Sequence, residues 1–424
     1  MNNKNAVSIN PKILFSCFLA GCLEMYDFIL FGFLGTLIHA NYLSFLTAEA
    51  GQMVTYLLFA VGFLFRPLGS LIFGYIGDVY GRKRAVVLSV SFMGTASLAM
   101  ALLPSYAIGG SLVCWAIVLI RIIQGISVGG EYSGVTIYAI EHTNRENIGI
   151  IGSIVVAGGA LGVLLATIIS KLVQNPALPE YSWRLAFLVG FGLSIIGYFI
   201  RKNLTESPLF IKGKGEKNTV PLLQGWKFFK KEFLASFLLA GANNANFYFI
   251  IIFLPGFLKT SYPNSPPFDT LTLTVIMLAM LPLIGWLSDK IGRFKILFVI
   301  SLCFVFYQYF LVSFLINASS PLISYIHVVI SATLIASFVS TTNVFVLEIF
   351  PTSCRFSCGA LSYSLGTALL GGTAPFVCSY IISSFGSNPN YLAYYISFLS
   401  LLGFLGLFLV RDFNQAKSEK TMTY

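Results

Sequence analysis

Long apolar runs, interrupted only by short polar segments, set the strongest limit on how this chain can fold. Most of them approach the roughly 20 residues that an α-helix needs to cross the hydrocarbon core of a bilayer. Backbone polar groups inside a bilayer must bond within their own segment, so the sequence predicts an all-α membrane protein with twelve transmembrane helices. The runs lie near residues 12–38, 52–76, 85–103, 110–140, 148–173, 185–200, 233–258, 270–287, 296–316, 322–347, 357–384 and 391–410.

The composition excludes an ordinary soluble domain. Of the 424 residues, 57% are hydrophobic and only 10% are charged, whereas soluble proteins are about 25% charged. The net charge of +10 would suit a nucleic-acid partner in a soluble chain. In a membrane protein it more often reflects Lys and Arg gathered in cytoplasmic loops. We therefore expect a lipid bilayer around the protein and no nucleic acid.

One polar and basic segment, residues 201–231, divides the runs into two sets of six. We expect two six-helix bundles joined by a linker in the cytoplasm. The predicted parts are an N-terminal bundle at 1–200, the linker at 201–231, a C-terminal bundle at 232–410 and a cytoplasmic tail at 411–424.

The distribution of basic residues predicts that both termini face the cytoplasm. In that orientation the outer connections carry only Lys171, Arg184 and Lys259, while Arg66 and Arg121 fall within spans. The remaining 21 of the 26 Lys and Arg residues then lie on the inner side. This bias is the positive-inside rule of membrane proteins.

The two halves repeat a loop pattern. After the second run the chain reads GYIGDVYGRKR (74–84), and after the eighth it reads GWLSDKIGRFK (285–295). Asp78 and Asp289 occupy the same place in the two copies and are 211 residues apart, almost half of the chain. Parallel repeats related by an axis along the membrane normal, with a binding site between them, are typical of transporters.

Charged residues at these helix ends are candidates for a gate that closes the cytoplasmic side in one state of the protein. Glu141 and Arg145 after the fourth run are matched by Glu348 and Arg355 after the tenth. The candidate gate residues are Gly74, Asp78, Gly81, Arg82, Arg84, Glu141, Arg145, Gly285, Asp289, Gly292, Arg293, Glu348 and Arg355.

The repeated loop G-x3-D-(R/K)-x-G-R-x-(R/K) resembles the signature loop of the major facilitator superfamily, although Val79 replaces a usual basic residue. The stretches EMYDF, FRPLGSLIFGYIGDVYGRK, QGISVGGEYSG, WRLAF and LTESP narrow the resemblance to the metabolite:proton symporter family. That family carries proline and betaine, 2-oxoglutarate, citrate and shikimate. The resemblance implies two pseudo-symmetric six-helix bundles in the inner membrane of a bacterium, and we expect a monomer.

Buried charges are the strongest indication of a mechanism. The spans contain three carboxylates, Glu24, Asp27 and Glu131, and two guanidinium groups, Arg66 and Arg121. Each charge costs roughly 2.5–3.5 kcal/mol within a bilayer on insertion scales. Two ion pairs would leave one carboxylate over, and an unpaired buried carboxylate takes up a proton. A carboxylate that loses this proton when an arginine turns toward it can carry protons across the membrane.

The roles of the three carboxylates remain alternatives at this point. Glu24 and Asp27 lie three residues apart, on one face of a helix. In related proton-coupled facilitators an acid on the first span and an arginine on the fourth form the coupling pair, which implies that role for Asp27 and Arg121. Glu131 is the rival proton site, and Glu24 would help to hold the arginines. The opposing interpretation is a structural ion-pair network that never titrates.

The substrate site is expected at the midplane, between the halves. The seventh run contains an unusually polar cluster, and other polar side chains lie at comparable depth. The candidate substrate residues are Tyr26, Gln124, Asn243, Asn244, Asn246, Tyr248, Tyr363 and Ser364. Hydrogen bonding between helices is the alternative role for each of them. Aromatic faces would suit a quaternary ammonium group.

These observations predict a secondary active transporter that imports a small polar metabolite with a proton by alternating access. The cargo would be a zwitterionic amino acid or osmolyte, or a small carboxylate. Proton-driven efflux and uncoupled facilitation are the alternatives. We find no nucleophile–base set, phosphate loop or metal cluster, so we predict no enzymatic activity, no cofactor and no metal.

Overall fold

The computed structural model describes residues 11–129, 132–141, 143–202, 228–266, 268–317, 320–350, 355–385 and 388–410. Within these ranges, twelve helices are long and apolar enough to cross a membrane. The predicted all-α membrane fold with twelve spans is therefore confirmed. The expected linker and tail lie largely outside the described residues.

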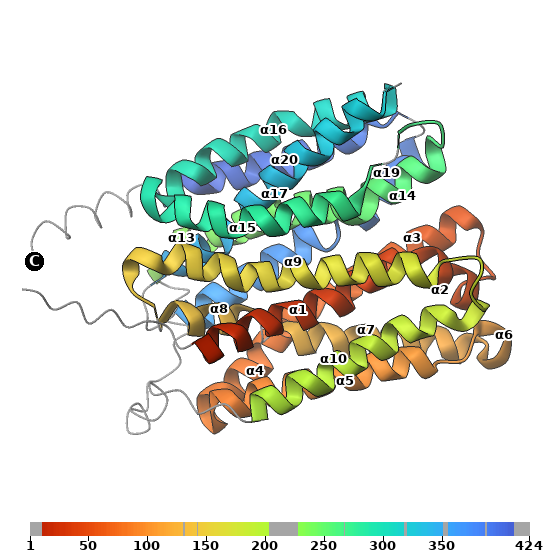
Figure 1. Cartoon of the computed structure of the whole chain (residues 1–424), viewed down its shortest axis with the longest axis horizontal. Coiled ribbons are helices and arrows are strands. Elements are labelled where there is room, and N and C mark those ends of the chain that lie inside the picture. Colours follow the sequence, from red (N-terminus) through yellow and green to blue (C-terminus); the bar gives the residue numbers. More distant parts are fainter. Residues whose placement is uncertain are drawn as a thin grey trace, which may run out of the picture.

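The N-terminal half contains ten α-helices in the described ranges (Figure 1). They are α1 (Pro11–Phe33), α2 (Gly35–Tyr42), α3 (Ala48–Leu64), α4 (Arg66–Tyr80), α5 (Arg82–Leu102), α6 (Tyr106–Gly109), α7 (Ser111–Gly129), α8 (Tyr132–Glu141), α9 (Ile148–Val173) and α10 (Trp183–Lys202), with the 3₁₀ turns η1 (Arg145–Asn147) and η2 (Glu180–Ser182).

The C-terminal half is built in the same manner. Its elements are α13 (Lys230–Tyr248), η3 (Phe249–Phe253), α14 (Leu254–Ser261), α15 (Thr270–Ile291), α16 (Arg293–Asn317), α17 (Pro321–Glu348), η4 (Arg355–Gly359), α18 (Ala360–Gly366), η5 (Thr367–Gly371), α19 (Ala374–Phe385) and α20 (Asn390–Phe408). The segments η3, η4 and η5 are π-helical. π-Helical turns inside α-helices are frequently found at functional sites.

The second span is broken near its middle. It runs over Ala48–Ile76, but α3 ends at Leu64 and α4 begins at Arg66 with Pro67 in its first turn. Proline lacks an N–H and ends the hydrogen-bond ladder of the helix before it. The break places Arg66 at the first position of α4, within the membrane interior.

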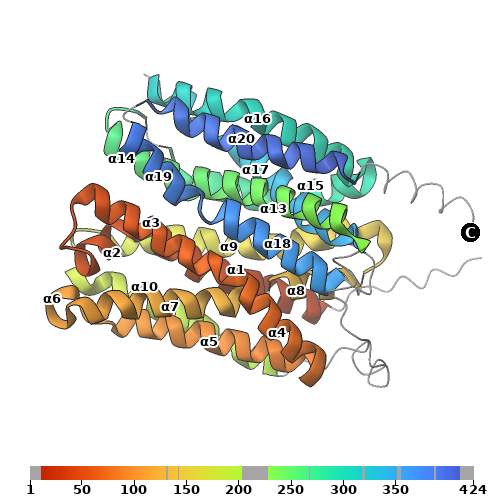
Figure 2. The ribbon, with the colours of Figure 1, turned by 180° about the vertical axis from the view of Figure 1, so that it is seen from behind.

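The two halves lie side by side and touch along several helices. Figure 1 shows α9 of the N-terminal half running beside α15 of the C-terminal half, and the two are packed along much of their length. Helix α4 contacts α18, and α3 contacts α19. Figure 2 shows α3, α4, α18 and α19 from behind. We call the end of the bundle where α1 begins and α20 ends the terminal face, and the other end the opposite face.

Candidate functional site

A buried ion pair joins α1 to the start of α4. Arg66 Nη2 lies 2.7 Å from Glu24 Oε1, and each residue is only 3% exposed. The guanidinium carbon of Arg66 is 5.4 Å from the centroid of the Phe63 ring. The pair lies close to the C-terminal half, within electrostatic range of Tyr248 on α13 and Tyr363 on α18.

Asp27 occupies a different environment, inside the N-terminal half. It is 1% exposed and lies against Gly190 of α10 and Ser97 of α5. Its Oδ1 has no hydrogen-bond partner among the described residues. Glu24 and Asp27 share one side of α1, as their spacing predicts, but Glu24 contacts α4 whereas Asp27 lies against α5 and α10.

Arg121 of α7 does not contact a carboxylate in the described part of the chain. It is fully buried and donates to Gln124 Oε1 at 2.7 Å and to the backbone oxygen of Leu58 at 3.2 Å. It remains within electrostatic range of Asp27. Asp27 and Arg121, the expected coupling partners, are therefore neighbours that do not form an ion pair in this structure. The guanidinium of Arg121 instead donates its hydrogen bonds to Gln124 and to backbone oxygens.

The ring of Phe28 lies close to the guanidinium groups of both Arg121 and Arg66. Its centroid lies 4.7 Å from the guanidinium carbon of Arg121 and 5.8 Å from that of Arg66. Both arginines thus interact with one aromatic ring, which follows Asp27 directly in α1.

A small cavity lies between the halves. Four of the predicted substrate residues, Asn243, Asn244, Tyr248 and Tyr363, are among those that line it. The remaining lining residues are Met25, Val156, Gly159, Ala160, Val163, Phe247, Met277, Leu281 and Val339. The sequence alone did not indicate this apolar lining, although the glycines and small residues of α9 are typical of a surface that another helix approaches closely.

The other predicted substrate residues are not among the residues that line the cavity. Tyr26 donates to the backbone oxygen of Ala186 at 2.8 Å, and Gln124 accepts from Arg121. Asn246 donates to Ser400 Oγ at 2.9 Å and accepts from Gln308 Nε2 at 2.6 Å, inside the C-terminal half.

Ser364 bonds Ser70 Oγ at 2.9 Å, across the two halves. This bond joins α18 to α4, one turn of helix beyond Arg66.

Asp289 holds the halves together at the terminal face. Its carboxylate accepts from the backbone N–H of Gly149 at 2.7 Å and of Ile150 at 2.9 Å, at the start of α9. Arg293 lies 2.6 Å from Asp289 and 3.2 Å from Glu348. A carboxylate at a helix N-terminus is also favoured by the helix dipole.

The remaining gate residues are placed as follows. Gly81 and Gly292 have φ values of 110° and 99°, which explains glycine in both loop copies. A side chain at Gly285 would overlap Ser153 of α9.

Arg355 Nε donates to the backbone oxygen of Leu347 at 3.0 Å. Gly74 is buried and Arg84 is exposed. Glu131 and the side chains of Asp78, Arg82, Glu141 and Arg145 lie outside the described part of the chain.

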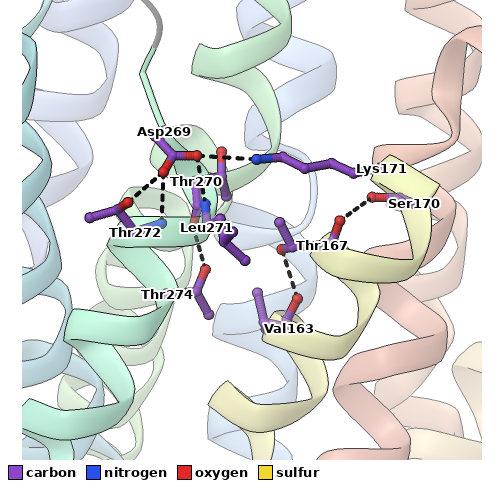
Figure 3. Close-up of polar contacts among 9 residues, drawn as sticks. All are labelled: Val163, Thr167, Ser170, Lys171, Asp269, Thr270, Leu271, Thr272 and Thr274. Carbon is purple, nitrogen blue, oxygen red and sulfur yellow. Dashed lines mark hydrogen bonds and ion pairs between the residues drawn. The ribbon is translucent and has the colours of Figure 1, made fainter. Parts of the chain in front are cut away.

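The halves also meet through an ion pair at the opposite face, which the sequence analysis missed. Lys171 Nζ, at the end of α9, lies 3.1 Å from Asp269 Oδ1, just before α15 (Figure 3). Asp269 also accepts from the backbone N–H groups of Leu271 and Thr272. Partial burial raises the pKa of the Asp269 carboxyl, but the hydrogen bonds from Thr272 and Lys171 outweigh it and the net shift is downward.

Two repeated helical bundles around a central cavity, with contacts between the halves at both faces, are the architecture of a secondary transporter. The chain belongs to the Major Facilitator Superfamily, whose family model matches residues 17–357. It is therefore a transporter of small solutes and not an enzyme.

Several known proteins resemble the whole chain. It is 28% identical over 417 residues to a putative proline/betaine transporter of Staphylococcus aureus, covering 95% of this chain and 88% of that protein. It is 30% identical to the glycine betaine/proline/ectoine/pipecolic acid transporter OusA of Dickeya dadantii, covering 95% and 84%. A structure of the proton:xylose symporter XylE has a TM-score of 0.77 at 16% identity, covering 95% of both chains. This last likeness concerns the fold.

Proposed function

We propose that this protein imports a small polar metabolite together with a proton, acting as a monomer in the inner membrane of a bacterium. The observation that carries the proposal is Asp27, a buried carboxylate whose Oδ1 has no hydrogen-bond partner among the described residues. A carboxylate in such a place is costly when charged, so it holds a proton until a counter-charge approaches.

The arrangement around Asp27 supports the coupling. Arg121 is already buried within electrostatic range of it, but its donors are occupied by Gln124 and backbone oxygens. A rotation of Arg121 toward Asp27 would stabilise the charged carboxylate and release the proton. One proton that moves down a potential of about 100 mV supplies about 2.3 kcal/mol.

In this proposal the terminal face is cytoplasmic, and the basic residues of the chain support that orientation. The cargo is a zwitterionic amino acid or osmolyte, or a small carboxylate. The relatives named as proline/betaine transporters support the first of these. Proton-driven efflux and uncoupled facilitation are the competing functions.

The test is proton entry into proteoliposomes that contain a pH-sensitive dye. Proline, glycine betaine, 2-oxoglutarate and citrate are added one at a time to wild-type protein and to Asp27→Asn. We expect one of them to cause acidification with the wild-type protein, and no acidification with the variant, which still exchanges cargo.

Three other outcomes would count against the proposal. Unchanged acidification with Asp27→Asn would show that Glu131 or Glu24, and not Asp27, carries the proton. Cargo entry without acidification in the wild type would establish facilitated diffusion. Acidification driven by cargo leaving the vesicles, and none during cargo entry, would establish efflux.

A further inference from the structure

We infer that the Glu24–Arg66 pair selects the cargo by charge, and that it opens only for a molecule carrying one positive and one negative group. This inference rests on the proposed transport of a small metabolite, but it does not depend on which residue carries the proton. It gives the pair a role in specificity, where the sequence alone suggested a scaffold for Glu24.

The pair lies behind the wall of the cavity, one residue away from its lining, although neither member is among the lining residues. Both members are within electrostatic range of Tyr248 and Tyr363, and these two tyrosines line the cavity. Met25, which follows Glu24 in α1, lines it as well. The tyrosines come from the C-terminal half and the pair from the N-terminal half, so a cargo at this place touches both.

Electrostatics decide which molecules can open the pair. Removing one partner of a buried ion pair leaves the other charge uncompensated, which is strongly unfavourable. An anion that bound Arg66 would leave the charge of Glu24 uncompensated. A cation that bound Glu24 would leave the charge of Arg66 uncompensated. A zwitterion compensates both charges at once, so it exchanges one set of buried contacts for another.

The aromatic surroundings suit the positive end of such a molecule. The guanidinium carbon of Arg66 is 5.4 Å from the ring centroid of Phe63, and Phe63 lies 4.8 Å from the ring of Tyr248. Aromatic faces attract ammonium groups, including quaternary ones. When Arg66 turns toward the carboxylate of the cargo, the ammonium group takes its place beside Glu24 and over these rings.

The test measures binding in nanodiscs, without a proton gradient, to four probes. L-Proline and glycine betaine carry both charges, choline carries only the positive one and N-acetyl-L-proline only the negative one. Wild-type protein is expected to bind a zwitterion at least about tenfold more tightly than either singly charged probe. Glu24→Gln should bind N-acetyl-L-proline more tightly relative to proline than the wild-type protein does. Arg66→Gln should bind choline more tightly relative to betaine.

Two controls keep the result interpretable. Glu49→Gln removes a carboxylate at an exposed position of α3 and should leave all four dissociation constants unchanged. If a single variant fails to fold, the double variant Glu24→Gln/Arg66→Gln removes both charges together, which buried pairs tolerate better than the loss of one. It should lose the preference for zwitterions over singly charged probes.

The inference is overturned if wild-type protein binds neither zwitterion, or if the single and double variants keep the wild-type order of affinities. An equal proportional loss of affinity for all four probes in the variants would also overturn it, because that result is expected if the pair has only a structural role. Since no gradient is present, a failure of proton coupling would leave this measurement unchanged. The two proposals can therefore fail separately.

Discussion

Asp289 of α15 binds the backbone N–H of Gly149 at the start of α9, with 2.7 Å between oxygen and nitrogen. This bond crosses from the C-terminal to the N-terminal half. It uses the acidic residue of the repeated loop, which the sequence marked as part of a gate, although the partner is a helix N-terminus and not an arginine of the other half.

Replacing Asp289 with alanine should open the terminal face. Hydrogen bonds to a charged group contribute about 1.5–3 kcal/mol each, so the ratio of closed to open states should fall about tenfold or more. Spin labels at Phe15 on α1 and Ile291 on α15, both exposed, would report a longer distance. Asp289→Asn keeps one acceptor and should have a smaller effect. Unchanged distances in Asp289→Ala would show that this bond does not hold the face closed.

Gly190→Ala should disturb proton coupling without unfolding the protein. A methyl group there would overlap Asp27 Oδ1, and this atom is the end of a side chain that can rotate away. We expect cargo-driven acidification to fall while cargo exchange persists. Gly192→Ala, in the same helix, has nothing within 4 Å of the added carbon and should keep normal coupling. Equal behaviour of the two variants would contradict the role of Asp27.

Asn243 and Asn246 should respond differently to replacement by alanine. Asn243 lines the cavity, and its Oδ1 has no hydrogen-bond partner in the described ranges, so Asn243→Ala should raise KM with little change in Tm. Asn246 bonds Ser400 and Gln308. Asn246→Ala leaves buried groups unsatisfied, at about 1–3 kcal/mol, and should lower Tm with KM unchanged. The reverse result would place the cargo beside Asn246 and its partners Ser400 and Gln308, and not in the cavity that Asn243 lines.

Between pH 8 and pH 3, the Lys171–Asp269 ion pair should weaken only at acid pH. The pKa of Asp269 is lowered while the pair is formed, so the pair stabilises contact at the opposite face above the ordinary aspartate pKa of about 3.9. This stabilisation is lost as the pH falls through the lowered pKa. Exposed pairs contribute about 0–1 kcal/mol, so the population should shift by less than about tenfold.

Spin labels at Ile108 and Leu322, both exposed, would measure this separation between pH 8 and pH 3. Lys171→Gln should remove most of the change, because the carboxylate then loses its counter-charge. A transition near neutral pH would show that another group controls this face.

The sequence predicted the spans and the repeat well, because apolar length and a loop motif are local properties of the chain. It also brought Asn243, Asn244, Tyr248 and Tyr363 to one site. It could not separate Asn246 from these, since Asn246 lies only about 60° around the helix from Asn243 and yet bonds Ser400 and Gln308 inside its own bundle. Nor could it pair Glu24 with Arg66, because these residues are 42 positions apart and only the packing of their helices brings them together.

The Lys171–Asp269 pair escaped the sequence analysis for a similar reason. Its members are 98 residues apart, and neither belongs to a repeated motif. Only the packing of α9 against α15 brings them together.

Helices α9 and α15 thus carry one contact between the halves at each end. The Asp289 side chain is 8% exposed, whereas Lys171 and Asp269 are 55% and 32% exposed. Dissolved salt screens exposed charges over about 8–10 Å and affects buried ones much less. In the proposed orientation the opposite face lies outside the cell, so a saltier medium would weaken the outer contact and leave the inner one intact. A rise in external ionic strength would then favour the outward-open form.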